Sequence, residues 1–297
     1  MILWGELAAL ATAIAWSFTA IFFSYSGRRI GSGVVNRSRL IFAFCFLLVT
    51  HRILLGEFFP WGTEPARWGW LAISSLLGLV LGDAFLFRAY VMIGPRLSML
   101  LMSTVPILST LFGWVLFQET VARIELMGIV LAVAGVAWVV TEGQTDPLLI
   151  DKKYYRRGLL FGLLGAFGQV ANLVTARFAL TDDYPAISAT VIRILVALVL
   201  LWGAAAIQGQ ITATINAWRD KLAFRALVAG AFVGPFLGIW FSLIAIQYTR
   251  LGIAATLMAL PPVILIPLEY IIYKRRVSPR GLIGTLMAMV GVALLFW

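Results

Sequence analysis

Hydrophobic runs about as long as a membrane-spanning helix follow one another along almost the whole chain, and this pattern restricts the fold more than any other feature. A helix that crosses a bilayer needs roughly 20 predominantly apolar residues. Of the 297 residues, 62% are hydrophobic and only 12% are charged. Soluble domains carry about 25% charged residues, because their surface must be covered with polar groups. The sequence therefore predicts an all-α integral membrane protein.

Ten such runs predict ten transmembrane helices. Short turns at residues 93–96 and 248–250 separate the third run from the fourth and the eighth from the ninth, so these neighbours should be antiparallel. The first run lacks a basic start and a small-residue cleavage site, which predicts a retained helix rather than a signal peptide. The predicted helices span about residues 3–25, 34–55, 68–92, 95–117, 124–141, 157–180, 186–207, 222–248, 251–273 and 280–296.

An internal repeat divides the chain. The offset of 156 positions from Pro106 to Pro262 also matches several glycines without a gap. Because each copy contains five helices, an odd number, the second copy must enter the membrane from the opposite side. Inverted repeats of this kind are common in secondary transporters. We predict a first five-helix repeat over residues 1–141, a linker over 142–156 and a second repeat over 157–297. The matched glycine pairs are Gly78 with Gly234, Gly82 with Gly238, Gly128 with Gly284, and Gly135 with Gly291.

The net charge of +10 does not indicate nucleic-acid binding, because the basic residues lie in short loops without an aromatic platform. Such loops fit the positive-inside rule and contact with anionic lipid. The loops after odd-numbered helices are the more basic ones, so both termini are predicted on the periplasmic face of a bacterial inner (plasma) membrane. The single His51 and single Cys45 leave no histidine metal cluster and no disulfide within the chain. With no Walker motif or catalytic constellation, we expect neither an enzyme nor a cofactor.

Several motifs, in this order and spacing, resemble the drug/metabolite transporter superfamily, specifically the EamA-type ten-helix permeases. They are Arg39 and Arg193 near helix starts, Ala89-Tyr90, Pro106, Gln118-Glu119 and Gly128 to Gly135, followed by Ala245, Pro262, Gly284 and Gly291. One departure is the basic run Lys274-Arg275-Arg276, which leaves Glu119 without an acidic counterpart in the second repeat.

The resemblance implies a carrier that moves amino acids, drugs or other metabolites through a central cavity lined by both repeats. We expect the carrier to act as a monomer. Aromatic amino-acid exporters of the YddG type are the subgroup that the chain resembles best.

Asp83 is the most informative charge within a span, because a charge at the bilayer centre costs roughly 2.5–3.5 kcal/mol. It could carry a proton, bind a substrate amine, or form a structural ion pair with Arg88 or Arg193. Arg88 follows Asp83 by five residues, which offsets the two around a helix. Glu269, towards the end of the ninth predicted helix, is expected near the membrane interface.

Other polar and aromatic residues near the middle of the spans predict the cavity walls. Glutamine and asparagine in lipid need partners, so they either join helices or contact a ligand. Tryptophan and phenylalanine there either pack or contact a ligand. The predicted substrate-binding residues are Trp16, Thr19, Asp83, Phe87, Met102, Gln169, Asn172, Trp240, Ser242 and Met258.

Prolines and glycines in the spans predict points of movement. A proline inside a helix removes a backbone hydrogen bond and bends the helix. Glycines let helices approach closely in lipid. Both features fit either static packing or hinges between moving bundles. The predicted gating residues are Pro106, Pro261, Pro262, Gly82 and Gly238.

The function predicted from these features is secondary transport of a small metabolite by alternating access, driven by the substrate gradient or by protons. The alternatives are a passive channel and a lipid-handling membrane protein.

Overall fold

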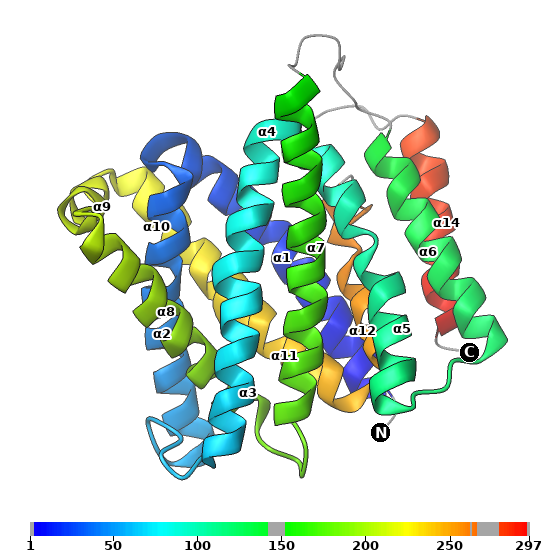
Figure 1. The fold of residues 1–297 in the computed structure, drawn as a ribbon, viewed down its shortest axis with the longest axis horizontal. Helices are drawn as coiled ribbons and strands as arrows, with labels where there is room; N and C mark the ends of the chain where they lie inside the picture. The colour runs from blue at the N-terminus through cyan, green and yellow to red at the C-terminus, as the bar shows by residue number, and fades with distance from the viewer. Residues whose placement is uncertain (1–2, 142–151, 262, 266–278, 296–297) are drawn as a thin grey trace.

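The computed structural model describes residues 3–141, 152–261, 263–265 and 279–295, and every element within these ranges is helical. The helices form one bundle with both ends of the chain at the same end of it (Figure 1). Within the described residues, six helices are long and apolar enough to cross a membrane, and three shorter apolar helices accompany them. The predicted all-α membrane class is confirmed, whereas the count of ten spans stays a prediction.

The first half of the chain contains α1 (Leu3–Ile30), α2 (Ser32–Leu55), α3 (Pro65–Ser75), η1 (Leu76–Gly82), α4 (Asp83–Met102), α5 (Val105–Phe117) and α6 (Arg123–Thr141). The second half contains α7 (Lys152–Ala179), α8 (Ala186–Ile207), α9 (Ile211–Ala217), α10 (Lys221–Ala231), η3 (Phe232–Gly238), α11 (Ile239–Tyr248), α12 (Leu251–Met258) and α14 (Pro279–Leu295).

Some helix limits differ from the prediction. Helix α7 begins at Lys152, earlier than the expected start at residue 157, and the short α9 falls in a predicted loop. Pro262, Glu269 and the basic run 274–276 lie outside the described residues.

The predicted turn at residues 93–96 does not interrupt α4, which stays helical from Asp83 to Met102. The chain nevertheless reverses there, because residues on both sides of Gly94-Pro95 face the same stretch of α7. A proline bends a helix without necessarily ending it. The facing pairs are Leu86 with Gly165, Ile93 with Gly158, and Leu101 with Gly162.

The fourth predicted span is interrupted next to its proline. Helix α4 ends at Met102, residues 103–104 form a turn, and α5 begins at Val105. Pro106 therefore lies in the first turn of α5 rather than at a kink within one helix. Proline fits the first turn of a helix because the missing N–H has no helical partner there.

The ninth predicted span is interrupted at the equivalent place. Helix α12 ends at Met258, and residues 259–260 leave the helix before it resumes at Pro261. These residues follow residues 103–104 by 156 positions, the offset of the sequence repeat. Both halves therefore interrupt a helix for two residues, and in both the next helical turn contains a proline.

A second repeated irregularity is a seven-residue π-helical segment. Segment η1 joins α3 to α4, and η3 joins α10 to α11. The two segments are 156 positions apart along their whole length. Isolated π-helical turns are rare and frequently occur at functional sites.

Helices α6 and α14 pack side by side at one edge of the bundle (Figure 1). A Cβ atom added to Gly128 would lie 2.7 Å from the carbonyl oxygen of Gly291, and one added to Gly135 would lie 2.6 Å from that of Gly284. The contact is reciprocal, since each glycine faces the repeat equivalent of the other. This is the pattern that a two-fold axis produces.

Candidate functional site

Asp83, the first residue of α4, forms an ion pair with Arg39 on α2. The Arg39 guanidinium also lies 5.8 Å from the centre of the Phe23 ring on α1. Of the alternatives left open for Asp83, an ion pair with Arg88 is not seen: Arg88 is exposed and its guanidinium lies 5.7 Å from the Phe161 ring. Five residues along a helix place two side chains on different sides, so Arg88 points away from Asp83.

Arg193 on α8 is the centre of a buried polar network. It is 2% exposed, donates to Oδ1 of Asn172 on α7, and is attracted electrostatically by Asp83. The same Asn172 oxygen accepts a hydrogen bond of 2.8 Å from Oγ of Ser74, and Oγ of Ser75 donates to the Arg193 carbonyl at 2.6 Å. Nε of Arg193 is buried without a hydrogen-bond acceptor among the described residues. The network therefore holds one unused cationic donor.

The π-helical segments receive side chains from the opposite half of the chain. A Cβ atom on Gly78 in η1 would lie 2.5 Å from Cγ of Asn172, and one on Gly234 in η3 would lie 2.5 Å from Oγ1 of Thr19. Gly78 and Gly234 are repeat equivalents at the offset of 156, whereas Thr19 and Asn172 lie 153 positions apart on α1 and α7, the first helix of each half. Glycine is needed at both places because any larger residue would displace these side chains.

The two predicted hinge glycines also lie between the halves. Gly82 packs against Gly168 of α7, whose Cα would lie 3.7 Å from a Cβ atom on Gly82. Gly238 packs against Trp16 of α1, whose Nε1 would lie 2.7 Å from a Cβ atom. Both positions therefore join helices from different halves, and their role as hinges stays a prediction.

Four of the predicted cavity residues pack against one apolar cluster. Met258 is buried within it, while Trp16, Met102 and Trp240 are partly buried at its edge. Met102 and Met258 are also the residues at which α4 and α12 stop. The structure thus packs two tryptophans from opposite halves against the same apolar cluster as the two methionines.

The other predicted cavity residues differ in what they offer a ligand. Ser242 is buried and its hydroxyl is engaged with the carbonyl of Ile239 at 2.7 Å, so it offers little to a ligand. Thr19 and Gln169 are half-buried, and the hydroxyl of Thr19 donates to the carbonyl of Ala15 at 2.8 Å. The side chain of Phe87 lies outside the described part of the structure.

The turn between α11 and α12 is held by residues that the sequence analysis did not single out. Oγ1 of Thr249 donates to Oε1 of Glu6 on α1 at 2.6 Å. The carbonyl of Thr249 accepts from Nη1 of Arg177 on α7 at 3.2 Å. Gly5 packs so closely on Thr249 that a Cβ atom there would lie 2.8 Å from the threonine backbone nitrogen.

The same turn is held by the segment that joins α5 to α6. Oε2 of Glu119 accepts from the backbone nitrogen of Leu251, at the start of α12, over 2.8 Å. Arg250 pairs with Glu125 on α6, with 2.6 Å between Nη1 and Oε2. We call these contacts, together with those of Thr249, the terminal-end clasp. It joins both halves at the end of the bundle that carries the chain termini.

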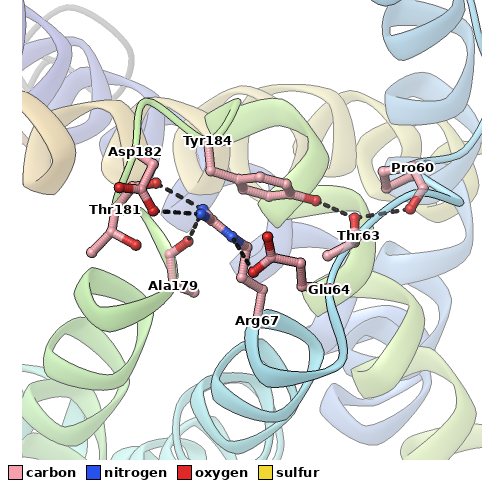
Figure 2. Close-up of polar contacts among 8 residues, drawn as sticks. All are labelled: Pro60, Thr63, Glu64, Arg67, Ala179, Thr181, Asp182 and Tyr184. Atoms are coloured by element: carbon pink, nitrogen blue, oxygen red, sulfur yellow. Dashed lines mark hydrogen bonds and ion pairs between the residues drawn. The ribbon is translucent and has the colours of Figure 1, made fainter.

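A second polar cluster closes the neighbouring loops (Figure 2). Nη2 of Arg67, at the start of α3, lies 2.7 Å from Oδ2 of Asp182, and its guanidinium lies 4.9 Å from the centre of the Tyr184 ring. The Tyr184 hydroxyl lies 2.5 Å from Oγ1 of Thr63. Burial raises the pKa of Tyr184, since it disfavours the charged phenolate. The cluster ties the loop before α3 to the loop between α7 and α8.

Comparison with known proteins agrees with this architecture. The model of the EamA-like transporter family matches residues 3–141 and again residues 156–297. A solved structure described only as the crystal structure of a protein has a TM-score of 0.80 with 17% sequence identity, over 98% of this chain and 95% of that one. This likeness shows the fold alone. No curated protein matches the chain. Because the two family matches cover nearly all of its length, the chain belongs to the EamA-like transporter family, whose members are membrane transporters of small solutes.

Proposed function

We propose that the protein is a secondary transporter that carries a small metabolite across the bacterial inner membrane by alternating access. The observation that carries this proposal is the pair of helix breaks after Met102 and Met258. Broken helices expose backbone groups at membrane depth, which is tolerated only where those groups face protein, water or a ligand. Transporters with inverted repeats bind their substrates at such breaks near the bilayer midplane.

We further propose that amino acids, including aromatic ones, are the substrates. The unused Nε–H of Arg193 is a donor suited to a carboxylate. The partly exposed Asp83 could bind an ammonium group if that group displaced Arg39 from its ion pair. Trp16 and Trp240, both half-buried, offer ring faces to a substrate side chain. Opposite charges beside an apolar wall are what a zwitterion with a large side chain requires.

The proposed access cycle uses inverted repeats over residues 1–141 and 157–297, joined by a linker, in a protein that acts as a monomer. The terminal-end clasp and the Arg67–Tyr184 cluster support a closed state at the end that holds both termini. Loop charge favours placing that end in the periplasm. The structure would then correspond to an inward-facing state, and opening to the periplasm would require these contacts to separate.

Counterflow in proteoliposomes tests the proposal. Vesicles loaded with an unlabelled amino acid should accumulate the labelled compound transiently, and uptake should saturate with concentration. A passive channel would show neither effect, and a lipid-handling protein would show no amino-acid flux. Failure to saturate for every amino acid tested would count against a carrier.

A proton is the coupling ion that Asp83 would support, because neutralising this carboxylate releases Arg39 from its ion pair. Asp83→Asn should therefore retain exchange but lose uphill transport in a pH gradient. Asp183→Asn is the matched control, since Asp183 is exposed and has the same change of charge. Unchanged uphill transport in Asp83→Asn would remove Asp83 from the coupling mechanism.

A further inference from the structure

A groove of 420 Å³ opens between α1 and α10 on the outer surface of the bundle. Small side chains on α10 leave this space, and other exposed side chains of both helices, such as Phe18 on α1 and Leu222 on α10, are large and apolar. Such a surface on two membrane-spanning helices faces lipid tails. The groove is lined by Ile21, Phe22 and Tyr25 from α1 and by Arg225, Ala226 and Ala229 from α10.

The groove contains one cation, Arg225, which is exposed and forms no ion pair with any described residue. The neighbouring Arg29 differs, because its Nε lies 2.7 Å from Oδ2 of Asp220 and its charge is therefore balanced. Its guanidinium also covers the Tyr25 ring at 5.8 Å from the centre. An uncompensated cation thus remains beside an apolar groove.

The position of Arg225 matches the level of lipid headgroups. Arg225 follows Lys221, the first residue of α10, by four residues, which corresponds to about 6 Å along a helix. The aliphatic part of an arginine can lie along apolar surface while its guanidinium reaches the interface. This end of the bundle is opposite the termini and is the more basic one (Figure 1). Basic pockets between spanning helices on the cytoplasmic side bind anionic headgroups.

We propose that this groove binds an anionic phospholipid. One acyl chain lies along Phe22, Ala226 and Ala229, and the phosphate pairs with Arg225. The site is separate from the helix breaks proposed to bind the transported substrate, so its occupancy is measured without any transport assay.

The test uses the full chain, purified in detergent and titrated with lipid under native mass spectrometry. The probes are phosphatidylglycerol and phosphatidylcholine with identical acyl chains. We expect one molecule of phosphatidylglycerol to bind each protein, more tightly than phosphatidylcholine does. Arg225→Gln should weaken this binding about fivefold, which corresponds to about 1 kcal/mol for one cation near anionic lipid. Ala229→Leu, which fills the groove without changing its charge, should also weaken it, and Arg225→Lys should retain most of it.

Arg219→Gln is the matched control, because Arg219 is exposed and precedes α10 outside the groove. An equal loss of binding in Arg219→Gln would overturn the proposal in favour of general surface charge. Full binding by Ala229→Leu would overturn it as well, since no acyl chain would then occupy the groove. Competition by inorganic phosphate at the affinity of the lipid would show a free-anion site instead. If Arg225→Gln does not fold, Arg225→Lys and Ala229→Leu still decide the outcome.

Discussion

Gly78→Ala tests whether the close contact between η1 and Asn172 holds the buried polar network together. The added methyl group would lie 2.5 Å from Cγ and 2.7 Å from Cβ of Asn172, so this side chain would have to leave Arg193 and Ser74. A lost hydrogen bond to a charged group costs about 1.5–3 kcal/mol and a neutral one about 1 kcal/mol. Replacing glycine by alanine within a helix itself raises the free energy of unfolding by about 0.5–1 kcal/mol. The net expectation is a loss of about 1.5–3.5 kcal/mol in the free energy of unfolding.

Denaturant unfolding of the detergent-purified protein measures this free energy. Gly69→Ala and Gly203→Ala are matched controls, because a Cβ atom at either position meets nothing within 4 Å. Both controls should therefore be neutral or more stable by up to about 1 kcal/mol. The reasoning is refuted if Gly78→Ala is as stable as Gly69→Ala, since the contact with Asn172 would then not be rigid.

Three further predictions concern the polar contacts at the terminal end. Glu119→Ala should lower the free energy of unfolding by about 0.5–2 kcal/mol, because the first backbone N–H of α12 loses its acceptor. Glu57→Ala, at an exposed residue, is the control in the same denaturant assay. Tyr184→Phe should cost about 1 kcal/mol through the lost hydrogen bond to Thr63. Burial raises the pKa of Tyr184, so its contribution is complete below about pH 10 and is lost as the pH rises further, because the unfolded chain releases the proton first. A denaturation series from pH 9 to pH 11 should slope downward for the wild type and less for Tyr184→Phe, and equal slopes would contradict the assignment.

The helical membrane class follows from the sequence because it depends on residue type and run length alone. The mid-span prolines were expected to disturb their helices, because proline removes a backbone hydrogen bond, whereas the glycines were expected to allow close helix contacts. Pro106 marks a break in the structure, at an offset of 156 positions from the break before Pro261. The π-helical form of η1 and η3 was not predictable, because no single residue type specifies it.

The ion-pair partners were harder to predict, because they depend on how distant helices are arranged. Arg39 and Arg193 were both expected near helix starts, but nothing in the sequence placed Arg39 beside Asp83. The partners of Glu119 at Leu251 and Arg177 come from the second half of the chain. The Glu119 contacts form only when the two halves dock, and the Arg39–Asp83 pair forms only when α2 packs beside α4. Local periodicity encodes neither arrangement.

The two halves share the same backbone irregularities but differ in their polar side-chain contacts. This difference indicates where a substrate would be recognised. Gly78 and Gly234 hold the same place in η1 and η3, yet one faces Asn172 and the other faces Thr19. Asn172 connects to a buried arginine, whereas the Thr19 hydroxyl returns to its own helix. Symmetric breaks and glycine contacts let the halves exchange shapes at similar energy. An asymmetric polar network can instead bind a substrate in one defined orientation, so substrate selectivity is expected on the side of Asn172.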